Sequence, residues 1–354
     1  MRLWGFAIAC ALVACGDDGN NTPADAPPLD DATADAPVDV AAPVDPTTLV
    51  ESGLCTDGPC AQIATGVRAY TPQYELYTDG ALKRRWIYLP PGTTIDTADM
   101  NHWRFPVGTR LWKEFARDGK KIETRFMEKR LADDDAPGAW FFVAFAWNEA
   151  EDATTVAPPS TGVMNANGTA HDIPTRAQCR QCHEGLQGRV LGFGAMSLDF
   201  AGPTGHLDLE ELVTSNLLSA PPPPTNGPYF PLPGTAAEKA AWGYLHANCA
   251  TCHNPQASNF GHTQVNFRLD VTKLGAVTEI PAHETTVGVQ GSVGGPPWID
   301  QPIVAPGDPD GSGLIQRMNV TVPGSMAKMP QLGTEIVDPA GLATLRAWID
   351  QLGT

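Results

Sequence analysis

The hydrophobic pattern changes along the chain and separates a strand-rich part from a helix-rich part. Between residues 51 and 172, four runs rich in β-branched and aromatic residues predict strands: Leu82–Leu89, Thr109–Phe115, Lys121–Met127 and Trp140–Trp147. Asp118-Gly119, between the second and third runs, is a hairpin signal because both residue types tolerate positive φ. We therefore expect a β-rich, sandwich-like domain over residues 51–172.

Five tryptophans lie in or near these runs: Trp86, Trp103, Trp112, Trp140 and Trp147. They can be interpreted as an aromatic binding surface or as core residues. Large aromatic side chains in strands usually fill the core, because their burial removes much apolar area from water. We predict that these tryptophans are buried.

Helical signals mark residues 235–354. Thr235 and Glu238 have the spacing of a capping box ahead of an Ala-rich run. Asp338-Pro339 has the composition of a second helix start, and its apolar residues recur on one face as far as Leu352. A short helix is expected within 207–215, and residues 221–234 form a Pro-rich connector.

The first fifty residues have the features of an export signal and a tether. Residues 1–14 have a basic Arg2 and a short apolar run, which is a targeting segment and not a membrane span. Leu12-Val13-Ala14-Cys15 resembles the bacterial lipobox, which implies cleavage before Cys15 and acylation of that residue. Gly16 follows Cys15 where an Asp would resemble an inner-membrane retention signal, so we expect an outer-membrane anchor facing the periplasm or the cell surface. The alternative is an ordinary secretory signal in which Cys15 is incidental.

Residues 15–50 form the predicted tether. They are rich in Asp, Ala and Pro and lack apolar periodicity, which predicts a disordered linker. The formal net charge of −17 is therefore partly a property of this linker. The acidic balance argues against nucleic-acid binding and favours a partner with a basic face.

Two C-x-x-C-H motifs carry the chemistry. The first is Cys179-Arg180-Gln181-Cys182-His183, and the second is Cys249-Ala250-Thr251-Cys252-His253. Two thiols at this spacing can add to the two vinyl groups of a haem, and the adjacent His can ligate the iron. The sequence therefore predicts two covalently attached haem c groups, one within residues 173–220 and one within 235–354.

Two other interpretations of the motifs are open. Four thiolates can share one zinc ion, although that leaves both His residues unexplained. A C-x-x-C pair can also be a thioredoxin-like redox site, although the flanking βαβ pattern is missing.

Distal iron ligands are less defined than the proximal ones. Met329 precedes Pro330 ahead of the last helix and is the predicted ligand of the second haem, with Met326 and Met318 as rivals. Arg317 is either a partner of a haem propionate or a solvated charge. For the first haem, Met196 is the nearest downstream Met; the alternatives are His206, His171, Met318 and an empty position.

The remaining cysteine pair is Cys55 and Cys60, which flank a Thr-Asp-Gly-Pro turn. With every other Cys assigned a role, these two are expected to form a small disulfide in an oxidising compartment.

The ordered runs YELYTDGALKRRWIYLPPG, FPVGTRLWKEF, IETRF, IPTRAQCRQCH, YLHANCATCHNP, PGDPDGSGLIQRM and KMPQLG together resemble a family of bacterial dihaem c-type cytochrome lipoproteins. Residues 235–354 resemble a class I cytochrome c domain. The resemblance implies two covalent haems and a β-rich N-terminal module. We expect an α+β multidomain chain, with the β-rich domain followed by a mainly α-helical, cytochrome c-like haem region.

Electron transfer with unknown redox partners is the first functional hypothesis. A dihaem peroxidase with an open first haem and Glu184 as acid–base group is the second. A binding module with an attached haem domain is the third.

Overall fold

A single antiparallel sheet is the scaffold of the computed structural model, which describes residues 44–258, 260–291, 301–322 and 327–353. In the described part of the chain its six strands follow one another in sequence order, and each pairs with the next. They are β1 (Val67–Ala69), β2 (Leu82–Tyr88), β3 (Arg110–Arg117), β4 (Lys120–Lys129), β5 (Trp140–Trp147) and β6 (Thr154–Val156). The four predicted strands are confirmed as β2 to β5, and the predicted hairpin joins β3 to β4 with Asp118 and Gly119 both at positive φ.

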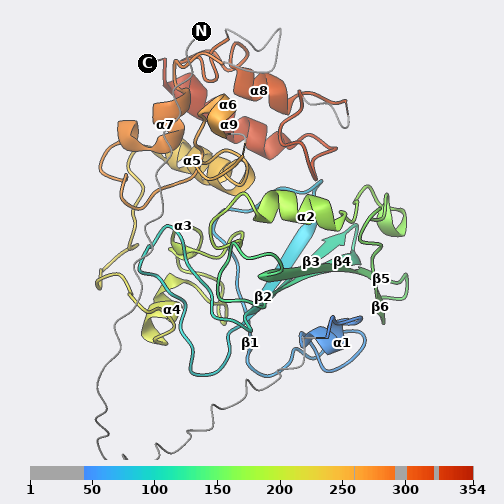
Figure 1. Cartoon of the computed structure of the whole chain (residues 1–354). Helices are drawn as coiled ribbons and strands as arrows, with labels where there is room; N and C mark the ends of the chain where they lie inside the picture. Colours follow the sequence, from blue (N-terminus) through green and yellow to red (C-terminus); the bar gives the residue numbers. More distant parts are fainter. Residues whose placement is uncertain (1–43, 259, 292–300, 323–326, 354) are drawn as a thin grey trace, which may run out of the picture. The chain divides into compact units, whose positions relative to one another are not determined.

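The sandwich-like prediction is wrong, because the described residues form one sheet and no second sheet packs on it. On one face, Trp112, Phe126 and Phe145 pack with Leu49 of α1 (Leu49–Ser52). On the other face, Leu111 belongs to a cluster that contains residues of α3 (Ala195–Leu198) and α4 (Leu209–Thr214). Short helices and loops therefore cover the two faces of the sheet, which in a sandwich a second sheet would cover on one side. Figure 1 shows α1 and α2 on opposite faces of the sheet. All five tryptophans named above are buried, as predicted.

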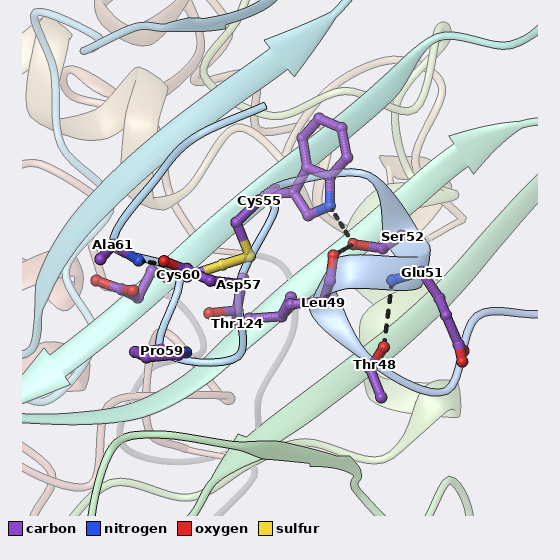
Figure 2. The surroundings of a disulfide bond; sticks show 12 residues. Thr48, Leu49, Glu51, Ser52, Cys55, Asp57, Pro59, Cys60, Ala61 and Thr124 are labelled. Atoms are coloured by element: carbon purple, nitrogen blue, oxygen red, sulfur yellow. Dashed lines mark hydrogen bonds between the residues drawn. A yellow bond between two sulfur atoms is a disulfide. The ribbon is translucent and has the colours of Figure 1, made fainter. Parts of the chain in front are cut away.

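A disulfide closes the loop after α1. Cys55 and Cys60 are joined by the predicted disulfide, and Cys55 is buried in the cluster beneath the sheet. Figure 2 shows this bond beside α1, whose Ser52 accepts a hydrogen bond from Trp112 Nε1 at 2.9 Å. The loop thus holds α1 against the sheet.

The remaining helices are short apart from two. They are α2 (Arg176–His183), α5 (Ala236–Asn248), α6 (Phe260–Thr263), α7 (Pro281–Thr286), α8 (Gly313–Met318) and α9 (Pro339–Gln351), with 3₁₀ turns at Ala166–Gly168 and Val277–Glu279. The predicted capping box starts α5, since Thr235 and Glu238 bond reciprocally, and Asp338 caps α9 as expected. Helices α5 and α9 pack together, with Gly341 against the ring of Tyr244 and the buried Trp242, Leu345 and Trp348 in one core.

A mainly α-helical cytochrome c-like region is also a wrong prediction. Helices make up only 24% of the described residues, and between α5 and α9 these residues are mostly turns and irregular segments with short helices. The chain has 35 Gly and 33 Pro, and both residue types disfavour helix interiors. The excess of loop follows from this composition.

The described residues belong to one compact unit. None of their helices combines the length and the apolar composition needed to cross a membrane. The predicted targeting segment, Cys15 and nearly all of the tether lie outside the described residues, so their roles stay predictions.

Candidate cofactor site

The first C-x-x-C-H motif lies in α2, a helix that the hydrophobic pattern did not predict. Thr175 caps it: its side chain accepts a hydrogen bond from the Gln178 N–H at 3.2 Å, and Gln178 Oε1 accepts from the Thr175 N–H at 2.8 Å. This capping box fixes the first turn, so that Cys179, Cys182 and His183 follow in helical order. Helix α2 contacts β5, where Phe142 lies 5.2 Å from the His183 ring, centroid to centroid.

The second motif directly follows α5. Cys249 caps the helix through a hydrogen bond from its N–H to Leu245 O, and the His253 N–H bonds to Cys249 O at 2.9 Å. The motif is therefore a continuation of the helical turn, with its position set by the buried α5 side chains Trp242 and Leu245.

The two motifs are in contact. Asn254, which is fully buried, donates from Nδ2 to Gly185 O at 3.0 Å. A Cβ on Gly185 would lie 2.5 Å from Thr251 O, so only a glycine allows this approach. Residues in or next to the two motifs are thus packed side by side, although Gly185 and Asn254 are 69 positions apart in the chain.

One cavity of about 1240 Å³ lies between the motifs and the sheet, and all four Cys and both His line it. Its walls are largely apolar and include Leu111, Met127, Phe142, Val265, Phe267, Ile303 and Leu314. Small-molecule and cofactor sites usually occupy about 300–1000 Å³. The cavity is large and apolar enough for a planar, mostly hydrophobic cofactor, and its size exceeds what one such ligand needs.

His183 is oriented for ligation. Its Nδ1 lies 2.6 Å from Arg189 O, and because a carbonyl only accepts, Nδ1 carries the hydrogen. Nε2 is therefore the nitrogen with the lone pair, and no described residue bonds to it. Burial lowers the pKa of His183 to about 4, so the ring is neutral at pH 7. A neutral imidazole fixed through its second nitrogen is the usual form of a metal-ligating His.

His253 is held differently. Its ring packs edge-on against Phe267 with centroids 5.6 Å apart, and its buried Nδ1 has no hydrogen-bond partner among the described residues. Burial, with a contribution from Arg317, lowers the pKa of His253 to about 4. This imidazole is also neutral, but packing and not a hydrogen bond sets its orientation.

The thiols do not have the features of a redox dithiol or of a zinc site. Burial raises the pKa of Cys249 to about 12 and that of Cys182 to about 11, and it also raises the pKa of Cys179. Thioredoxin-like pairs need a lowered thiol pKa. Within the described ranges, no group of three or more His, Cys, Asp or Glu side chains is arranged to hold a metal ion, so the four thiols do not converge on a shared zinc position.

The structure brings together some of the predicted second-haem residues. Met329 and Met318 both line the cavity, as does Arg317, whose Nε donates to Ala327 O at 3.0 Å. Met326 lies outside the described residues. Met329 therefore stays the predicted distal ligand of the second haem, and Met318 stays the alternative.

Most residues predicted as the distal ligand of the first haem do not line the large cavity. Met196 is buried in the core around Trp242 and does not line the cavity that contains His183. His171 is bonded to Glu123 at 2.7 Å, and His206 contacts Thr71 Oγ1 at 2.9 Å. Of the first-haem candidates, only Met318 lines the large cavity.

A row of cations on the sheet was missed by the sequence analysis. Arg85, Lys113 and Arg125 are directly opposite one another on β2, β3 and β4, and the last two line the cavity. Arg125 pairs with the buried Glu123 at 2.5 Å, whereas no described carboxylate pairs with Lys113. Burial and the neighbouring cations lower the pKa of Lys113 well below its usual value. Alternating charges in strands normally indicate a solvent-exposed face, which is why this row gave no signal.

A comparison with protein-family models, with characterised proteins and with solved structures found no match to this chain. The resemblance to dihaem lipoproteins therefore stays a prediction from the motifs quoted above.

Proposed function

We propose that the protein is an electron carrier that uses two covalently attached haem c groups. The observation that supports it most strongly is the position of both C-x-x-C-H motifs in the wall of a single apolar cavity. A chance motif has no reason to place its thiols and its imidazole against a cavity, and two chance motifs have still less reason to share one.

Haem, when bound, supplies a one-electron couple at iron; the chain supplies attachment, orientation and surroundings. Cys179 with Cys182 and Cys249 with Cys252 would hold the two porphyrin edges by thioether bonds. His183 and His253 would each offer a neutral nitrogen to iron. The apolar walls exclude water, which keeps the surroundings similar in both oxidation states and favours fast electron exchange.

The alternative of a dihaem peroxidase needs a free acid–base side chain beside an open haem. Glu184 lines the cavity, but its carboxylate is engaged by Arg180 at 2.5 Å. No other specific observation favours peroxide chemistry, so we favour electron transfer.

Anchoring and partners belong to the same proposal. Acylation of Cys15 would attach the chain to the outer membrane, with the acidic tether separating it from the bilayer surface. The redox partners would present a basic face to the acidic chain.

The optical spectrum of the exported chain tests the proposal. We expect two low-spin haems per chain that are reduced reversibly and do not respond to peroxide. One high-spin haem that reacts with peroxide would favour the enzyme. A chain without covalent haem would contradict both.

A further inference from the structure

The two chain segments that would hold the haems touch each other directly. Gly185 follows His183 by two positions, and Thr251 lies between Cys249 and Cys252. The approach of Gly185 to Thr251 O, together with the Asn254–Gly185 hydrogen bond, therefore joins the two attachment segments themselves and not distant parts of the chain.

The thiols follow the same arrangement. Cys182 and Cys252 are close enough to influence each other electrostatically, and both line the cavity. Each of these thiols would be bonded to the edge of one porphyrin. The attachment points of the two porphyrins at Cys182 and Cys252 would therefore be neighbours.

Cavity size points the same way. A volume of about 1240 Å³ exceeds the roughly 300–1000 Å³ typical of one ligand site. A second cavity beside the motifs, lined by Leu186 and Thr251 among others, has a volume of only about 90 Å³. Two porphyrins would therefore share one space without a protein layer between them.

We propose, on the basis of the function proposed above, that the two haems form an electronically coupled pair, and that the contact of Gly185 with Thr251 and Asn254 sets their separation. Electrons would then pass from one haem to the other within the chain, which would hold up to two electrons, one at each haem.

Circular dichroism in the Soret region tests this, because two like chromophores in close contact give a paired positive and negative band. The mature haem-loaded chain is titrated from fully oxidised to fully reduced while the haem count is read by intact mass. We expect a paired band in both end states and its loss at half reduction, when the two haems no longer absorb at the same energy. A spectrum that equals the sum of two independent haems at every stage would overturn the proposal.

Gly185→Ala provides the matched variant. Its Cβ must displace Thr251, so the paired band should weaken while both haems stay attached. Gly194→Ala is the control, since its added Cβ meets nothing within 4 Å and its φ of −176° suits any residue. Equal spectra for the two variants would contradict the role of Gly185. If the unaltered chain carries fewer than two haems, the proposed function itself fails, and the mass reports that outcome separately.

Discussion

The side-chain amide of Asn254 donates a hydrogen bond to the backbone carbonyl of Gly185 at 3.0 Å, and thereby links the segments that directly follow the two C-x-x-C-H motifs. The same Nδ2 donates to Ala250 O at 2.7 Å, inside the second motif. Asn254 is fully buried, so its side-chain amide cannot replace these two bonds by bonds to water.

Asn254→Ala should therefore lower the free energy of unfolding by about 1–3 kcal/mol, the usual cost of leaving buried polar groups unpaired. Urea unfolding of the haem-loaded chain measures the change. Asn319→Ala, at an exposed position after α8, is the control and should have little effect. Equal stability of the two variants would show that the Asn254 link is not important.

Two different reduction potentials are expected for the two haems. The hydrogen bond from His183 Nδ1 to Arg189 O makes that imidazole more basic, which stabilises ferric iron. His253 lacks such a bond in the described structure, and a Met ligand on its haem would favour ferrous iron. We predict a lower reduction potential for the first haem than for the second. Potentiometry measures both potentials, and the variant that lacks Cys249 and Cys252, which would carry only the first haem, shows which potential belongs to that haem. The opposite order would contradict this account.

Met329→Ala should convert the second haem from low-spin to high-spin and lower its potential, because the thioether sulfur would be lost from iron. Optical and electron paramagnetic resonance spectra follow the change. Met164→Ala, at a side chain that lines the cavity but is 65% exposed, is the control. If Met318→Ala produces the change and Met329→Ala does not, Met318 is the ligand.

Acid stability depends on a buried carboxylate. Burial raises the pKa of Glu123, but Arg125 and the hydrogen bonds from His171 and Arg125 outweigh it, so the pKa lies below its usual value of 4.5. A lowered carboxyl pKa stabilises the fold above about pH 4.5, and this contribution is lost as the pH falls through the folded-state pKa.

Glu123→Gln should thus be destabilised by about 3–5 kcal/mol at pH 7, the usual cost of breaking a buried ion pair. Its deficit relative to the parent should shrink as the pH falls below about 4.5, because the carboxylate takes up a proton first in the unfolded chain and, at lower pH, in the folded parent. Urea unfolding between pH 3 and pH 7 tests this, with the exposed Glu149→Gln as control. A deficit that does not change with pH would rule out the charge as its cause.

Removal of the Cys55–Cys60 disulfide should cost about 2 kcal/mol, as expected for so short a loop. The double change to Ala would loosen α1 from Trp112, so near-ultraviolet circular dichroism should change along with the urea midpoint. A reductant should have the same effect on the parent chain and none on the variant.

Local signals explain most of what the sequence predicted correctly. The strands β2 to β5, the Asp118-Gly119 hairpin and the start of α5 depend on neighbours within a few residues, and such patterns are readable in one sequence. Helix α2 was missed although Thr175 and Gln178 have capping-box spacing, so that signal was present.

Tertiary packing decided the rest. The sequence does not show that helices and loops, and not a second sheet, cover the faces around Leu111 and Trp112. Met196 is the nearest Met after His183 in the chain, yet it lies in the core beside Trp242, and β3 brings Lys113 to the cavity instead. Distance along the chain is a poor guide to which side chains share a cavity.

The most direct test of the central claim is the intact mass of the exported chain under denaturing conditions, because thioether-linked haem remains attached. The account predicts the mass of the chain plus two haem groups, and the loss of one haem group when Cys249 and Cys252 are both changed to Ala. A chain with four unmodified thiols at Cys179, Cys182, Cys249 and Cys252, or a double variant that still carries two haems, would contradict it.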